Sequence, residues 1–86
     1  MITDVAIKLE RGTIYSIALR SGDHTDLVKR MRPHESISAI ARATHGFLTH
    51  QHEFLSRPKA RKHALAIGQV KETLHSRELH YEDLMR

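Results

Sequence analysis

The 86-residue chain contains no cysteine and no tryptophan, and its aromatic side chains are only two phenylalanines and two tyrosines. Without cysteine the protein has no disulfide, no thiolate metal site and no cysteine nucleophile. No run of about 18 apolar residues occurs, so the sequence predicts no membrane span. The first ten residues lack the pattern of a signal peptide. We therefore expect a cytoplasmic protein that makes no contact with a membrane.

The composition is that of an ordinary globular protein, with 40% hydrophobic and 28% charged residues. A chain of this length is expected to form one domain, residues 1–86. So small a domain buries only about 60–65% of the surface that its unfolded chain exposes, and oligomerisation often compensates for the thin core. We therefore expect a homo-oligomer.

The formal net charge is +4, and positive charge is concentrated in one part of the chain. The segment from residue 57 to residue 77 contains six basic residues and one acidic residue, Glu72, so its net charge is +5. The six are Arg57, Lys59, Arg61, Lys62, Lys71 and Arg77. Such a concentration attracts phosphates or acidic partners. A solvated helix face has the same composition and is the alternative.

The first third of the chain has the pattern of a β-hairpin followed by a short helix. Apolar residues alternate at Val5, Ile7 and Leu9, and residues 13–19 are rich in β-branched and aromatic residues. Arg11-Gly12 between them is a turn signal. A helix is expected to begin near residue 24, after a cap at residue 21 or 23, and to end before residue 33. Residues 35–45 fit both a strand and a helix, so their structure stays open.

The second half predicts two short strands and two helices. The strands are residues 46–49 and 53–55, around a polar turn. Ser56 has the properties of an N-cap for a helix that ends near Gly68, and residues 76–85 have the pattern of a short final helix. The predicted fold class is therefore α+β, with an N-terminal β-hairpin, short antiparallel strands and two to three helices.

The start of the helix after Ser56 has the chemistry of an anion site. Free backbone N–H groups and the helix dipole favour an anion there, and Arg57 adds a forked, charge-assisted contact. Phe47 and Phe54 lie just upstream, and an aromatic face beside arginines suits a nucleotide. Burial of both rings in the core is the alternative.

Metal binding and catalysis have less support. His50 and His52 are spaced like metal ligands on a strand, but no cysteine completes a zinc site and the other histidines are not at diagnostic spacing. The sequence has no nucleophile elbow, no phosphate-binding loop and no dinucleotide-binding loop. Neighbours such as His34-Glu35 arise by chance among eight histidines. We expect no catalytic residue, no metal and no cofactor.

One block of the sequence resembles a family of small phage and prophage proteins. The block runs from Gly46 to Gln69 and contains Gly-Phe-Leu-Thr, then Phe-Leu-Ser-Arg, and finally Gly-Gln. The family includes the phage anti-Thoeris sponges, oligomers that sequester cyclic ADP-ribose signals made by bacterial TIR-domain enzymes. The sequence departs from the family pattern at Glu53, where arginine is usual, and at Ser56, where aspartate or asparagine is usual.

The resemblance implies which residues bind the ligand. Arg20 would neutralise a phosphate, Phe47 would stack on a base, and Arg57 would bind a phosphate or a polar edge. A pocket shared by two subunits is implied, because one thin domain scarcely encloses a ligand the size of a dinucleotide. The expected ligand-binding residues are Arg20, Phe47, Ser56, Arg57, Lys71 and Arg77.

The leading hypothesis is a phage-type anti-defence protein of the host cytoplasm. It would sequester a cyclic nucleotide or a cyclic ADP-ribose-type signal without turnover. The alternatives are a small basic nucleic-acid-binding module and a protein inhibitor of a host enzyme. The scarcity of aromatic residues disfavours a stacking platform for long single strands.

Overall fold

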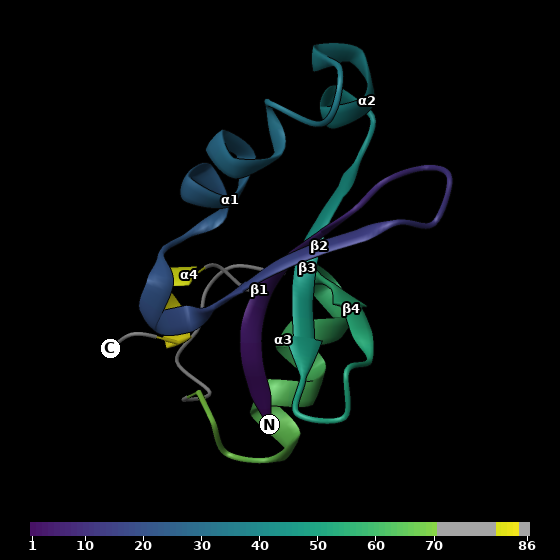
Figure 1. Cartoon of the computed structure of the whole chain (residues 1–86). Coiled ribbons are helices and arrows are strands. Elements are labelled where there is room, and N and C mark those ends of the chain that lie inside the picture. The colour runs from purple at the N-terminus through teal and green to yellow at the C-terminus, as the bar shows by residue number, and fades with distance from the viewer. Residues whose placement is uncertain (71–80, 85–86) are drawn as a thin grey trace.

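The computed structural model describes residues 1–70 and 81–84, which form the expected α+β fold (Figure 1). The strands are β1 (Ile2–Lys8), β2 (Ile14–Ala18), β3 (Thr44–Thr49) and β4 (Phe54–Ser56). The helices are the 3-10 helix η1 (Leu19–Ser21), α1 (His24–Met31), α2 (Ile37–Ala41), α3 (Arg57–Ala66) and α4 (Tyr81–Leu84). No helix in the described ranges is long and apolar enough to cross a membrane.

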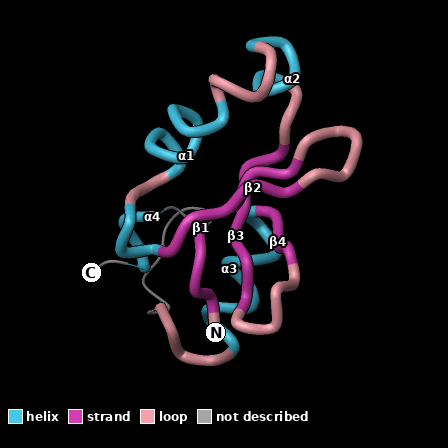
Figure 2. Tube along the Cα trace, in the orientation of Figure 1, coloured by secondary structure: helices cyan, strands magenta, loops and turns pink. Residues whose placement is uncertain are grey.

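The four strands form one antiparallel sheet in the order β2-β1-β3-β4 (Figure 2). β1 and β2 are the predicted hairpin, in which Val5 lies opposite Ile17. On its other side β1 pairs with β3, where Val5 lies opposite Phe47. β1 is therefore an interior strand. This pairing joins residues that are between 36 and 47 positions apart, and no local pattern in the sequence predicts it.

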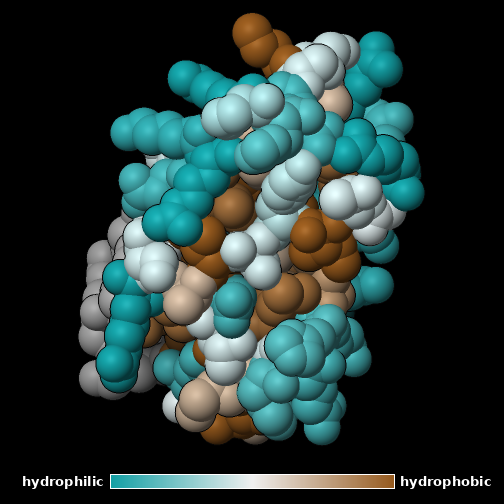
Figure 3. All heavy atoms as spheres, viewed as in Figure 1, coloured by the Kyte–Doolittle hydropathy of each residue, from teal (hydrophilic) through white to brown (hydrophobic). Residues whose placement is uncertain are grey.

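One face of the sheet is the core face. Side chains alternate between the two faces of a strand, and the alternate positions that share a face with Val5 are buried beneath α1 and α3. Figure 1 shows α3 behind β3 in this view. The strands contribute Val5, Ile7, Ile17, Phe47 and Leu55, and the helices contribute Leu27, Met31, Ala60 and Ala64. In Figure 3 apolar residues gather in the middle of the molecule and hydrophilic residues surround them.

Helix α1 begins at the predicted place because Asp23 caps it. The Asp23 carboxylate accepts a hydrogen bond from the Asp26 N–H at 3.0 Å, and the Asp26 carboxylate accepts one from the Asp23 N–H at 3.0 Å. This reciprocal pair satisfies two N–H groups of the first helical turn. Leu27 and Met31, one turn apart, then face the sheet.

The ambiguous residues 35–45 form two elements. Ser36 caps α2 by accepting a hydrogen bond from the Ala39 N–H at 3.1 Å, and α2 ends after only five residues. The chain is extended again from Thr44, two residues before the predicted strand. Of the two patterns at residues 37–41, the helical one is realised, and the strand begins only after them.

The second half agrees with the sequence in its elements and differs in its details. Helix α3 starts at Arg57, and Ser56 occupies the N-cap position without a side-chain hydrogen bond to the helix. Gly68 follows the helix with a φ of 74°, which favours glycine. Gly46 in β3 has no room for a side chain, since an added Cβ meets the Leu55 carbonyl oxygen and comes within 2.7 Å of the Phe54 ring.

Candidate anion-binding site

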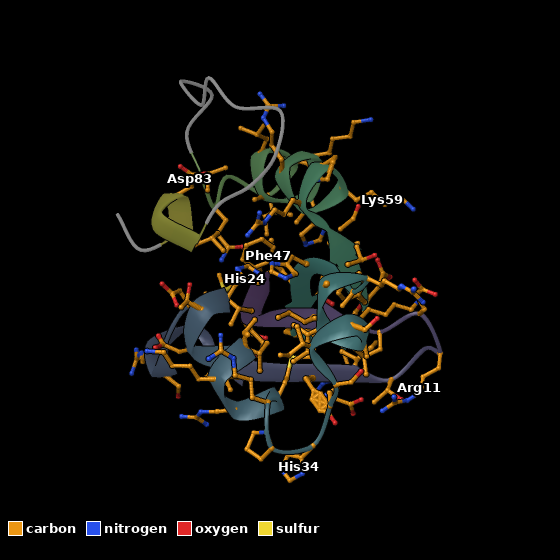
Figure 4. All side chains as sticks on the ribbon, turned by 90° about the horizontal axis from the view of Figure 1, so that it is seen from above. Arg11, His24, His34, Phe47, Lys59 and Asp83 are labelled. Atoms are coloured by element: carbon orange, nitrogen blue, oxygen red, sulfur yellow. The ribbon has the colours of Figure 1, made fainter. Side chains whose placement is uncertain are left out.

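Two histidines from distant parts of the chain stack on one another above the core. The rings of His24 in α1 and His45 in β3 are 5.3 Å apart and 7° from parallel. His24 also lies edge-on to the Phe47 ring at 5.1 Å. Figure 4 shows His24 and Phe47 side by side between α1 and α3. His24 is buried and His45 is partly exposed, so the pair extends from the core to the surface.

Local structure holds the His24 ring in one orientation. His24 is the first residue of α1, and its Nε2 lies 2.7 Å from the Gly46 carbonyl oxygen. A carbonyl oxygen only accepts, so Nε2 is the protonated nitrogen and donates this hydrogen bond. In the neutral imidazole Nδ1 is then the acceptor. The capped start of α1 and the backbone of β3 together fix this tautomer.

Helix α3 brings two arginines to the same side of the sheet. Ala60 and Ala64 are buried against the core, and Arg57 and Arg61, one turn apart, flank them. The Nε atoms of both arginines are buried, and neither has a hydrogen-bond partner within the described structure. A buried donor without a partner costs about 1–3 kcal/mol. Such a group calls for a specific explanation, such as a water or an ion at the site.

The positive charge of Arg57 acts on both histidines and favours an anion in this region. Burial lowers the pKa of His24 below its usual value, and Arg57 and His45 lower it further. Burial and then Arg57 lower the pKa of His45 as well. Both imidazoles are therefore neutral near pH 7 and donate or accept hydrogen bonds without adding charge. We call His24, His45, Arg57 and Arg61 the histidine–arginine cluster. Arg57 acts on both histidines, and Arg61 is included because it lies one turn from Arg57 on α3.

The structure places the expected ligand-binding residues in different surroundings. Arg57 belongs to the histidine–arginine cluster. Phe47 is completely buried, so its ring has no free face on which a base could stack, and it supports His24 instead. This placement does not fit the expected stacking role, and it realises the alternative of a core ring. Arg20 lies exposed in η1. Lys71 and Arg77 lie outside the described residues.

Ser56 lines a pocket on the opposite face of the sheet. This pocket has a volume of about 390 Å³, and Lys8, Phe54 and Lys59 line it with Ser56. The Lys8 ammonium lies 5.8 Å from the centroid of the Phe54 ring, a distance typical of a cation–π contact. Ser56 opposes Gly46 in the sheet, so it faces away from Phe47 and the core.

Sequence reasoning missed three of the four cluster residues. His24 was noted as the start of a helix and as part of the opening element of the resemblance, His45 was set aside as a metal ligand because of its spacing, and Arg61 was counted only among the basic residues. The available signals were the alternation of His45 with Phe47 on one strand and the spacing of Arg57 and Arg61 by four residues on one helix. In the described ranges no group of three or more His, Asp or Glu side chains is placed to hold a metal ion.

Comparison with known proteins gives one result. Curated proteins and solved structures yield no match. The family model of the phage T4 y16D protein matches residues 1–85, nearly the whole chain. The chain therefore belongs to the phage T4 y16D protein family.

Proposed function

We propose that this phage-family protein binds a small nucleotide-type anion at the histidine–arginine cluster and holds it without turnover. The observation that carries the proposal is the pair of buried Nε atoms of Arg57 and Arg61, which have no partner in the described structure. A phosphate supplies several strong acceptor oxygens, and arginine binds it through a planar fork of N–H donors. Anion binding relieves the cost of both unpaired donors.

The two neutral histidines give the site hydrogen-bonding groups in addition to the charges of the arginines. His24 presents Nδ1 as an acceptor because its Nε2 donates to Gly46. His45 has one ring face against His24 and is partly exposed, so its edge is open to a ligand hydroxyl. Ribose hydroxyls and phosphate oxygens match this mixture of donors and acceptors. A nucleotide therefore fits better than a simple carboxylate, which lacks the hydroxyl groups.

The phage family suggests what such binding is for. A phage protein that sequesters a cyclic nucleotide or a cyclic ADP-ribose-type immune signal suppresses the host defence that depends on the signal. The family membership supports a phage protein, and the anti-defence role rests on the resemblance of the Gly46–Gln69 block to sponge proteins. In this proposal a homo-oligomer completes the pocket, since one small subunit encloses a dinucleotide poorly.

A capture-and-release experiment tests the proposal. The purified protein is incubated with cyclic ADP-ribose or a cyclic dinucleotide, the free ligand is removed by ultrafiltration, and the protein is heat-denatured. Recovery of the intact ligand supports sequestration. Recovery of degraded ligand indicates an enzyme instead. No depletion before heating contradicts the proposal for that ligand.

Binding to a polynucleotide is the second candidate, and the exposed outer face of α3 favours it. Lys59 and Lys62 lie exposed there, and Figure 4 shows Lys59 pointing away from the core. Polynucleotide binding falls steeply with salt, because each neutralised phosphate releases counterions. Lys59→Ala and Lys62→Ala are expected to weaken it, whereas capture of a small ligand at the histidine–arginine cluster is not expected to depend on them.

A further inference from the structure

The Phe54 ring lies on the outer face of the sheet, the face opposite the core. Phe54 and Ser56 alternate with the buried Leu55 along β4, so both point away from the core. The tip of the ring occupies the place of a side chain at position 46, since a Cβ added to Gly46 comes within 2.7 Å of Phe54 Cζ. The ring is therefore held against β3, and unlike the Phe47 ring it is only partly buried.

A lysine from another strand lies over this ring. The Lys8 ammonium is 5.8 Å from the centroid of the Phe54 ring, and the Lys8 side chain is exposed. A lysine side chain is flexible and strongly hydrated, so it leaves the ring more easily than a packed core residue does. An exposed cation–π contact contributes little free energy, whereas a flat aromatic ligand offers the ring a larger contact. The Phe54 ring is therefore accessible to a ligand that displaces the lysine.

The pocket beside the ring contains the groups that bind a phosphate. Its volume of about 390 Å³ lies within the range of about 300–1,000 Å³ that is typical of small-ligand sites. Lys8 and Lys59 line it with one acidic residue, Glu10, so two positive charges and one negative charge leave a net charge of +1. Thr44 and Ser56 add hydroxyl groups that donate or accept hydrogen bonds. We call the hollow formed by these five residues, Leu9 and Phe54 the Phe54 pocket.

We propose that the Phe54 pocket binds one nucleotide unit, at a site separate from the histidine–arginine cluster. The base stacks on Phe54 in the place of the Lys8 ammonium, and the ammonium groups of Lys8 and Lys59 bind the phosphate. Stacking on an aromatic side chain tolerates every base, because every base has a π face. The unit is a free nucleotide or a nucleotide within a single strand, since both present the same base, sugar and phosphate. A carboxylate alone matches the charge but offers no flat ring to Phe54.

Titration with AMP and with a single-stranded adenine hexanucleotide tests the Phe54 pocket. Isothermal titration calorimetry measures the affinity for each probe. Binding of AMP identifies a free nucleotide as sufficient, and binding of the hexanucleotide alone identifies a strand as the ligand. In both cases Phe54→Leu is expected to weaken binding at least about fivefold, which corresponds to the loss of one stacked base. Lys8→Glu places a negative charge beside the phosphate and is expected to weaken binding as well.

Matched variants separate the Phe54 pocket from the general attraction of a basic protein for anions. Phe54→Tyr keeps the flat ring and is expected to retain the affinity that Phe54→Leu loses. Lys29→Glu makes the same change of charge at an exposed position of α1 and is expected to weaken binding less than Lys8→Glu does. Circular dichroism checks that each variant is folded, and if Phe54→Leu is not, the two lysine variants decide. The proposal is overturned if neither probe binds, if folded Phe54→Leu binds like wild type, or if both lysine variants weaken binding equally.

The Phe54 pocket and the histidine–arginine cluster share no residue, so the two proposals fail independently. Loss of nucleotide binding in Phe54→Leu with binding retained in Arg61→Met assigns the nucleotide to the Phe54 pocket. The reverse result assigns it to the histidine–arginine cluster and overturns the present proposal.

Discussion

The Arg11 guanidinium at the tip of the β-hairpin donates two parallel hydrogen bonds, of 2.8 and 2.6 Å, to the Glu35 carboxylate. Tyr15 donates a third hydrogen bond to the same carboxylate. The Glu35 side chain is only 6% exposed, and it connects the hairpin to the segment between α1 and α2. Figure 4 shows how far Arg11 lies from the histidine–arginine cluster around His24. This contact therefore stabilises the fold without belonging to the site.

The Glu35 contact makes stability depend on pH in the acid range. Hydrogen bonds from Arg11 and then Tyr15 lower the pKa of Glu35 to about 2 from the 4.5 of an ordinary glutamate. The unfolded chain therefore binds the proton more readily, and stability is lost as the pH falls from 4.5 to 2. Urea unfolding across this range is expected to show the loss. Glu35→Gln is expected to be less stable than wild type at neutral pH and to lose less of its unfolding free energy on acidification. Glu53→Gln, an exposed turn residue, is the control.

Phe47 is expected to be essential for stability and dispensable for ligand contact. Its ring is fully buried in the centre of the core. Phe47→Ala is therefore expected to lower the free energy of unfolding by about 3–5 kcal/mol. Phe47→Leu fills more of the space and is expected to fold. Its ligand affinity, measured on folded protein, is expected to stay close to that of wild type. A folded Phe47→Leu protein that no longer binds the ligand would contradict this prediction and would indicate that a base stacks on the Phe47 ring.

Arg57 and Arg61 are expected to serve binding at a cost in stability. Arg61→Met keeps the packing of the stem and removes a buried Nε that has no partner in the described structure. We expect this variant to be as stable as wild type, or more stable by about 1 kcal/mol, and to lose anion binding. Lys62→Met on the exposed side of α3 is the matched control and is expected to keep both properties. Thermal unfolding and ligand depletion measure the two effects. If Arg61→Met lowers stability, Arg61 has a structural partner and the argument from its unpaired donor is lost.

The stacked histidines are expected to weaken the fold below neutral pH. Burial lowers the pKa of both His24 and His45 in the folded state. The unfolded chain then takes up protons first, so stability is full above the unfolded pKa of about 6.5 and falls as the pH drops below it. His45→Asn removes one of the two groups and is expected to reduce this loss, while His34→Asn, an exposed histidine, is not. Excess phosphate is expected to offset the loss in wild type, because an anion favours the protonated imidazoles. An unfolding free energy that stays constant between pH 7 and 5 would contradict this prediction.

Much of the secondary structure was predictable because its signals are local. Asp23 lies at the right position to cap a helix, and Arg11-Gly12 separates two strands that alternate in polarity. The segment from residue 35 to 45 could not be assigned from the sequence, because its local signals conflict. Its residues satisfy two periodicities, and only packing of Ala39 and Ile40 beside the core selects helix there before the strand begins.

The fold class, most of the elements and the excess of positive charge could be predicted from the amino-acid sequence, because periodicity, caps and composition act over a few neighbouring residues. Which side chains meet depends on the packing of the whole fold. That packing placed β1 between β2 and β3, buried Phe47, and stacked His24 on His45 beside Arg57. It also brought Lys8, Phe54 and Lys59 to one pocket. These contacts arise from long-range strand pairing and helix packing, whose free energy depends on the whole core and leaves no signal within a short stretch of sequence.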